Sequence, residues 1–204
     1  MSLQRRSLLA GLAALLAAPA MAADAAAAAP IVALNQALIA SMKAGKSATF
    51  AQRYAGIVAA VDRAFDLPTV LQQSVGPRFA SLPADQQTKL LEVFRKFTAT
   101  SYAANFDDDE GEKLVVLPEQ RAVGEDLVVQ TQIVPAKGDP VRIDYVMHKG
   151  PQGWRAIDVL LNGNISQNAV KRSDFRSLVS PTSAQALIDS LQKKVVDLSG
   201  GALS

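Results

Sequence analysis

The first half of the chain repeats apolar residues at helical spacing. One stripe occupies residues 31–44 and stops at Gly45, a common helix terminator. A second stripe follows a cap at Ser47, a short third helix is expected after Asp66, and a long fourth helix follows Pro83. The fourth helix carries the apolar positions Leu90, Leu91, Phe94, Phe97, Tyr102 and Phe106. Each helix is apolar on one side, so each needs a partner surface.

The pattern changes from helix to strand after the acidic segment 107–110. Four runs rich in β-branched and aromatic residues are predicted strands, at residues 113–117, 127–134, 141–148 and 154–161. The short turns between them favour an antiparallel meander. The third run alternates, with Val141, Ile143, Tyr145 and Met147 on one face and Arg142, Asp144 and His148 on the other. This alternation predicts a sheet with one covered and one polar side.

Helical patterns return after a tight corner at residues 162–164. Residues 165–178 form a predicted helix capped by the corner or by Ser166, and a last helix opens with Thr182 and Gln185 in capping-box spacing. Helices, then a sheet, then helices again predict a single α+β domain. In it, helices wrap around one face of a curved, roughly four-stranded antiparallel sheet.

Residues 1–22 have the three parts of a secretory signal: Arg5 and Arg6, an apolar run, and small residues before a cleavage site after Ala22. An uncleaved anchor is the alternative, and the arginine pair also permits twin-arginine export. The signal holds two of the 21 Lys and Arg and none of the 19 Asp and Glu, so its removal leaves 19 of each. A chain without a basic excess is not expected to bind nucleic acid.

The rest of the chain is predicted to form one domain without disulfides, since it has no cysteine. Residues 23–29 are expected to be a disordered alanine-rich tether, residues 30–199 the domain, and residues 200–204 a tail. No segment after the signal is expected to be long and apolar enough to span a membrane.

Reactive side chains are few, with no cysteine and one histidine. His148 is interpreted as a surface residue. The acidic segment 107–112 is interpreted as a solvated turn or a docking patch, because its acids lack the alternating spacing of an EF-hand calcium loop. The sequence therefore predicts no catalytic residue, no cofactor and no metal site.

Asp158 lies within the apolar fourth strand, where a buried carboxylate needs a partner. An ion pair with Arg142 or Arg172 that fixes the strand-to-helix corner is favoured over a general base in an apolar cavity. Gly163 is expected because the corner needs backbone angles that glycine tolerates, and Trp154 is interpreted as an aromatic side chain that anchors the core. The predicted structural corner is Trp154, Asp158, Gly163 and Arg172.

A series of short motifs runs through the domain in the order Phe65-Asp66-Leu67, Gly76, Phe94, Phe97, Ser101-Tyr102, Asp144-Tyr145, Trp154, Asp158-Val159, Gly163, Ser166, Arg172 and Phe175. In combination, from about Pro30 to Leu198, they resemble the MlaC/toluene-tolerance family of periplasmic lipid carriers. Residues 101–106 and 164–175 are most similar to its hopanoid-associated HpnM branch. Residues 107–110 depart from the family, because many relatives are expected to have an aromatic residue there.

The resemblance implies an NTF2-like fold with an apolar cavity between helices and sheet. It implies a periplasmic shuttle that moves a hopanoid or a phospholipid between inner- and outer-membrane components without chemical change. The implied partners are the lipid, an inner-membrane transporter of the RND or ABC type, and an outer-membrane lipoprotein. The shuttle itself is expected to be a monomer.

The side chains expected to line this cavity are Tyr54, Ile57, Val58, Phe94, Phe97, Tyr102, Val129, Tyr145, Met147, Val159, Phe175, Leu187 and Leu191. Ordinary core packing is the alternative for each, because periodicity does not distinguish a lined cavity from a filled core. Two other functions stay open at this point. One is a small-molecule enzyme of the cone-shaped α+β type with Asp158 or Asp144 as base, and the other is an adaptor that tethers transport components.

Overall fold

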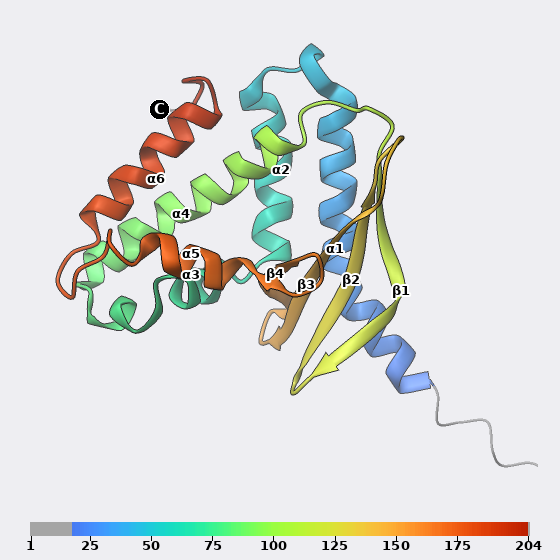
Figure 1. Ribbon diagram of the computed structural model, residues 1–204, viewed down its shortest axis with the longest axis horizontal. Helices are drawn as coiled ribbons and strands as arrows, with labels where there is room; N and C mark the ends of the chain where they lie inside the picture. The colour runs from blue at the N-terminus through green and yellow to red at the C-terminus, as the bar shows by residue number, and fades with distance from the viewer. Residues whose placement is uncertain (1–17, 204) are drawn as a thin grey trace, which may run out of the picture.

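The computed structural model describes residues 18–203 and the side chains of residues 25–203. The described helices are α1 (Ala18–Ala44), η1 (Gly45–Ser47), α2 (Phe50–Ala64), α3 (Leu67–Val75), η2 (Gly76–Ser81), α4 (Ala84–Asn105), α5 (Gln167–Phe175) and α6 (Gln185–Leu198). The strands are β1 (Lys113–Val123), β2 (Asp126–Val134), β3 (Val141–Gly150), β4 (Gly153–Leu161) and β5 (Ile165–Ser166). Helices, sheet and closing helices follow one another in the predicted order (Figure 1).

The strands form one antiparallel sheet in the order β1-β2-β3-β4-β5, which confirms the predicted α+β class. The sheet has five described strands rather than four, because β5, predicted as the start of a helix, pairs with the end of β4. β1 also continues through the turn predicted at residues 118–120. A bulge between Val116 and Gln120 absorbs Pro118, which cannot donate a ladder hydrogen bond.

The helices cover one face of the sheet in two groups (Figure 1). α1 packs on α2 and lies along β1, β2 and β4, whereas α3 and α5 pack together beside β4. α4 joins the groups, since it contacts α2, α3 and α6. The largest fully buried side chains come from α1, α2, α3, α4, α6 and β3: Phe94, Ile31, Leu34, Leu38, Ile57, Leu71, Leu90, Met147, Leu187, Ile188, Leu191 and Val61.

α1 begins before the predicted domain boundary. The helix starts at Ala18, and Ala27 and Ala28 are buried in the core, so the structure has a packed helix where the sequence predicts a disordered tether. Alanine is the best helix former, and its small side chain lets the helix pack closely, which outweighs the cost of Pro30 inside the helix. Residues 1–17 lie outside the described residues, and cleavage after Ala22 stays a prediction.

One described helical segment, Ala25–Ser47, is long and apolar enough to cross a membrane, contrary to the expectation that none follows the signal. The fold accounts for its apolar side chains. Ile31, Leu34 and Leu38 are almost fully buried in the core, where α1 packs on α2 and the sheet.

Polar side chains cap the N-termini of most of the later helices. Thr49 caps α2 through a capping box, whereas the predicted cap Ser47 lies in η1. Asp66 caps α3 and Ser166 caps α5, as the sequence predicts. α6 begins after Ala184 without a side-chain cap, so the capping box predicted at its start does not form.

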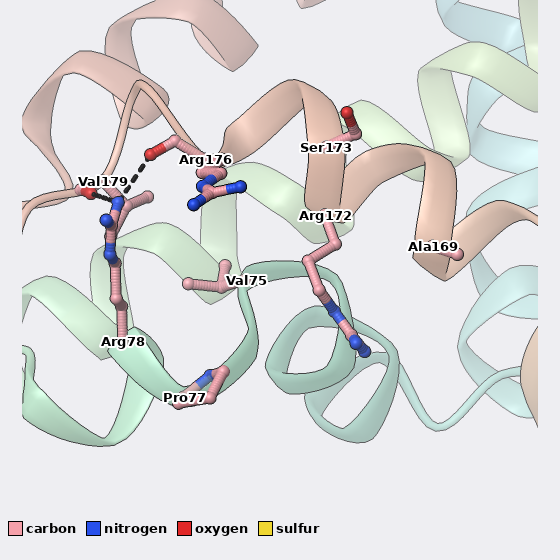
Figure 2. Close-up of a pocket in the computed structure, with 8 residues that line it drawn as sticks. All are labelled: Val75, Pro77, Arg78, Ala169, Arg172, Ser173, Arg176 and Val179. Atoms are coloured by element: carbon pink, nitrogen blue, oxygen red, sulfur yellow. Dashed lines mark hydrogen bonds between the residues drawn. The ribbon is translucent and has the colours of Figure 1, made fainter.

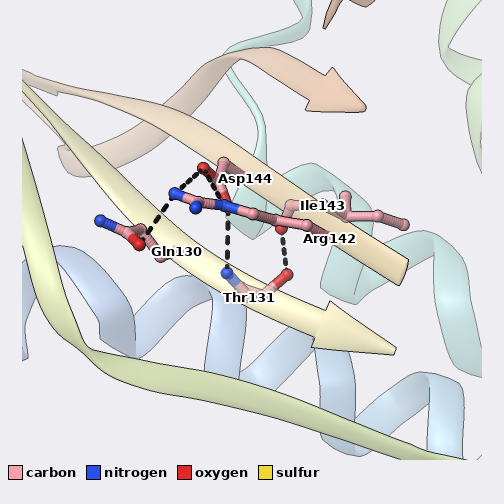
Figure 3. A network of polar contacts seen from close by, with 5 residues as sticks. All are labelled: Gln130, Thr131, Arg142, Ile143 and Asp144. Atoms are coloured by element: carbon pink, nitrogen blue, oxygen red, sulfur yellow. Dashed lines mark hydrogen bonds and ion pairs between the residues drawn. The ribbon is translucent and has the colours of Figure 1, made fainter. Parts of the chain in front are cut away.

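The face of the sheet predicted to be polar holds an ion pair whose carboxylate is buried (Figure 3). The carboxylate of Asp144 is fully buried, and both its oxygens lie 3.0 Å from Nε of Arg142. Arg142 also donates a hydrogen bond of 2.8 Å to Gln130. The amide of Thr131 donates to Asp144 at 3.4 Å, and its hydroxyl donates to the carbonyl of Ile143. These side-chain contacts replace part of the ladder between β2 and β3.

We expect Arg142→Met to lower the free energy of unfolding by about 3 kcal/mol, because it leaves a buried carboxylate unpaired. This is the low end of the usual range, since the Arg142 side chain is 42% exposed. Urea denaturation measures the change. Adding Asp144→Asn removes the charge but keeps an acceptor for Thr131, so the double variant should recover most of the loss. A single variant as stable as the parent would contradict the ion-pair role.

Candidate functional site

A narrow pocket opens between α3, α4, α5 and β4, and we call it the chamber. It is lined by Phe65, Leu67, Val70, Phe94, Thr98, Tyr102, Asp158, Val159, Gln167, Asn168 and Lys171. Its volume of about 70 Å³ equals the space of about two water molecules. Ligand pockets are usually about 300–1,000 Å³, so the chamber is much smaller than a lipid-sized pocket, and the apolar cavity that the resemblance implies stays a prediction.

Aromatic rings form the inner wall of the chamber. The ring of Phe65 lies 5.8 Å from that of Tyr102 and 6.1 Å from that of Tyr145, measured between centroids. Phe65 is fixed by its backbone, because it forms a parallel bridge with Ala156 of β4, and the amide of Asp66 donates to the Ala156 carbonyl at 3.0 Å. The link between α2 and α3 is thereby attached to the sheet.

The side chains of Tyr102 and Tyr145 form a hydrogen bond with each other beside the inner wall of the chamber. Burial raises the pKa of Tyr145 to about 12, and the hydrogen bond with Tyr102 acts in the opposite direction. Burial also raises the pKa of Tyr102, and Tyr145 adds to that rise. Tyr145 also lines a second cavity of about 10 Å³ beside α1. The neutral tyrosine pair therefore stands between two small cavities.

Polar groups of β4 and α5 surround the mouth of the chamber. Asp158 accepts hydrogen bonds from the Ser166 hydroxyl at 2.5 Å, from the Asn168 amide at 3.0 Å and from the Val159 amide at 2.8 Å. The side chain of Asn168 donates to the carbonyl of Ile157 at 2.7 Å. These bonds hold the start of α5 against β4.

The brace at the corner is therefore a hydrogen-bonded cap, and the predicted ion pair of Asp158 is wrong. Arg142 pairs with Asp144 instead, and Nε of Arg172 donates to the carbonyl of Gln73 at 2.8 Å. A carboxylate that accepts two backbone amides and a hydroxyl is satisfied without a cation.

The other two residues of the predicted corner have structural contacts. Gly163 has φ of 76°, and a Cβ there would lie 2.9 Å from Nε of Arg142, so both backbone angle and space require glycine. Trp154 is partly buried against the core.

Lys171 supplies the one cation among the residues that line the chamber. Burial lowers the pKa of Lys171, and the nearby carboxylates of Asp158 and Asp174 partly oppose this shift. The chamber thus combines an apolar interior with a mouth that carries an ammonium group, a carboxylate and two amides.

The predicted lining residues fall into three groups. Phe94, Tyr102 and Val159 line the chamber, and Tyr145 lines the second cavity. The core contains Ile57, Val129, Met147, Phe175, Leu187 and Leu191, while Tyr54, Val58 and Phe97 are partly buried against it. A role in ligand binding stays a prediction for all thirteen.

The sequence did not identify most of the polar residues at the mouth of the chamber. Gln167, Asn168 and Lys171 are polar residues on a short helix and gave no periodic signal, whereas Phe65 and Leu67 belong to a motif used for the family resemblance. Gln167, Asn168 and Lys171 also lie in the segment 164–175 used for the resemblance, so for all five residues the motifs were the available clue.

The remaining candidate chemistry lies apart from the chamber. Nδ1 of His148 lies 2.7 Å from Asp126 on the exposed side of the sheet, so His148 does not pair with Asp144. Within the described part of the chain, no group of three or more His, Asp or Glu side chains is placed to hold a metal ion.

A helix-covered antiparallel sheet with an apolar cleft and a polar mouth defines an α+β protein with a sheltered pocket. The profile of the family described as MlaC protein matches residues 33–193. A solved structure with a TM-score of 0.70 is the phospholipid-binding protein from Ralstonia solanacearum in complex with a phospholipid. The two share 18% sequence identity over 84% of this chain and 98% of that one. None of the curated proteins gives a significant match.

The chain therefore belongs to the MlaC family, since the family profile covers most of its length. The likeness to the Ralstonia protein supports the same fold. The resemblance to the HpnM branch stays an expectation.

Asp158→Asn should lower the free energy of unfolding by about 1–2 kcal/mol, because an amide offers one acceptor oxygen and places an NH₂ group against existing donors. Asp174→Asn is a matched control, an exposed carboxylate on α5. It should change stability by less than about 0.5 kcal/mol. Urea unfolding of both variants measures the two changes in the free energy of unfolding. Equal changes would contradict the role of Asp158 in holding α5 against β4.

The tyrosine hydroxyls should lose their protons at a higher pH in the folded protein than in the unfolded chain. Burial raises the pKa of Tyr54, Tyr102 and Tyr145 above the usual value of 10.0 in the folded chain, to about 12 for Tyr145. The folded state then holds more protons than the unfolded state between pH 10 and 12, so stability should fall as the pH rises through this window. Tyrosinate absorbance in the native protein and in urea measures the shift. Titration of all three near pH 10 in the folded state would contradict it.

Proposed function

We propose that this protein is a periplasmic lipid carrier that shelters the apolar part of a hopanoid or phospholipid between inner- and outer-membrane components. The observation that carries the proposal is the amphipathic chamber, whose aromatic inner wall ends in an uncharged tyrosine pair and whose mouth holds Lys171. An apolar chain gains about 0.8 kcal/mol for each methylene that leaves water. The phospholipid bound by the Ralstonia protein supports this choice of ligand.

Cargo entry requires the chamber to widen. The volume of about 70 Å³ holds only a small part of an acyl chain or a polycycle. α3 and α5 pack on each other and face α4 across the chamber, so movement of this helix pair away from α4 is the direct route. Rotation of the Tyr102–Tyr145 pair would join the chamber to the second cavity. We therefore propose that cargo enters beside α5 and extends toward α1.

The polar head of the cargo stays at the mouth in this arrangement. Lys171, Gln167 and Asn168 offer hydrogen-bond donors there, and a head group near them remains in contact with water. A hydroxylated hopanoid and a phospholipid both fit this division. The expected partners are an RND or ABC transporter in the inner membrane and an outer-membrane lipoprotein, and the carrier is expected to act as a monomer after export.

The enzyme alternative has weaker support. The oxygens of Asp158 already accept hydrogen bonds from Ser166, Asn168 and Val159. Asp144 pairs with Arg142 on the other face of the sheet and does not line the chamber. Neither carboxylate is free to act as a general base, so we propose carriage without chemical change.

Thr98→Trp tests the chamber directly, because an indole at this lining position occupies the space of the cargo. Loss of two sheltered methylenes costs about 1.6 kcal/mol, so retained lipid should fall roughly 15-fold. Mass spectrometry of lipid extracted from purified protein gives the amount and also separates hopanoid from phospholipid.

Thr88→Trp is the matched control for this substitution. Both threonines lie on α4 and donate to the carbonyl four residues earlier at 2.9 Å, but Thr88 is exposed and does not line the chamber. Equal lipid content in the two variants, or none in the parent after incubation with lipid vesicles, would refute the proposal. Transport that survives Thr98→Trp would favour the adaptor.

A further inference from the structure

A second, larger pocket lies on another side of α5, and we call it the arginine groove (Figure 2). Its volume is about 510 Å³, and it is lined by Val75, Pro77, Arg78, Ala169, Arg172, Ser173, Arg176 and Val179. Ala169, Arg172 and Ser173 of α5 line the groove together with Arg176, which follows the helix, whereas Gln167, Asn168 and Lys171 line the chamber. The groove is therefore separate from the chamber.

Three arginines surround the groove, and two are fixed by backbone carbonyls. Nη1 of Arg78 donates to the carbonyls of Arg176 at 2.6 Å and Val179 at 2.7 Å. Nε of Arg172 donates to the carbonyl of Gln73 at 2.8 Å. Each guanidinium has five N–H groups, so most of their donors remain available to a ligand. Figure 2 shows Arg78 and Arg176 at one end of the groove and Arg172 at the other.

The positive charge of the groove is uncompensated. None of the ion pairs among residues 25–203 involves Arg78, Arg172 or Arg176. The groove itself is lined by no carboxylate. Its floor is apolar, since Val75 and Val179 are 8% and 3% exposed. An anion with an attached apolar part would complement both features.

We propose that the arginine groove binds the phosphate of an anionic phospholipid head group and so docks the protein on a membrane surface. Guanidinium groups match phosphate geometry with paired hydrogen bonds. Arg78 and Arg176 lie at the same end of the groove and suit a single phosphate better than an extended acidic peptide, whose charges would be spread along a longer surface, and Arg172 adds positive charge at the other end. Val75, Pro77 and Val179 can contact the glycerol and first methylenes of the lipid.

The test is sedimentation of the full mature protein with vesicles of phosphatidylcholine alone or with added phosphatidylglycerol. We expect binding to the anionic vesicles that weakens as salt is raised. Arg176→Gln is the primary variant, because no hydrogen bond or ion pair fixes its side chain among the described contacts. A basic residue near an anionic surface contributes about fivefold in affinity, so Arg176→Gln should lose roughly that factor. The double variant Arg172→Gln/Arg176→Gln should lose roughly 25-fold.

Arg121→Gln on β1 is the control, with the same charge change at an exposed position outside the groove. Equal binding of Arg121→Gln and the double variant, or equal binding to both vesicle types, would overturn the proposal and leave an acidic protein as the alternative partner. Calorimetric titration with inorganic phosphate measures the affinity of the groove for a free anion. Phosphate binding as tight as vesicle binding would overturn the membrane assignment in favour of a free anion.

This proposal can fail independently of the carrier proposal. Thr98→Trp should keep vesicle docking while it loses cargo, because it alters the chamber alone. Arg176→Gln should keep its cargo while it docks more weakly, because it alters the groove alone. Loss of both properties in either variant would contradict two separate sites.

Discussion

The position of α5 depends on one carboxylate. Asp158 lies in the second half of β4 and accepts hydrogen bonds from the Ser166 hydroxyl and the backbone amide of Asn168, the groups that begin α5. Without this acceptor, the Asn168 amide in the first turn of a nine-residue helix would be unsatisfied next to an apolar strand. α5 forms one wall of the chamber and one wall of the arginine groove, so both sites depend on this cap.

The sheet restricts the movement of the helices that pack on it. α1 runs along β1, β2 and β4, and the Arg142–Asp144 pair with Gly163 fixes the opposite face, so this part of the molecule is rigid. α3 and α5 instead pack mainly on each other, and they contact the sheet at β4 and, for α5, at β5. The chamber lies between this part of the sheet and the helix pair α3 and α5, so the widening that we propose would move the helix pair.

The sequence predicted the fold well where local patterns decide it. The helix stripes, the strand alternation and the caps Asp66 and Ser166 involve residues close together in the chain. Partners far apart in sequence were harder to find: Asp158 is satisfied by hydrogen bonds instead of an arginine, and the arginine groove joins Arg78 to residues about one hundred positions later. The alanine-rich start of α1 was missed because its burial depends on a neighbouring surface that composition does not reveal.

The small chamber also explains why predicted lining residues are found in the core. An empty cavity costs about 24 cal/mol for each Å³, so a lipid-sized void of about 300 Å³ would cost about 7 kcal/mol, comparable to the whole stability of many domains. Without cargo the walls must close, and residues such as Phe94 and Tyr102 then pack like ordinary core. A carrier of the kind we propose would use the same side chains for stability when empty and for binding when full. Sequence periodicity records their burial in both states and cannot separate the two roles.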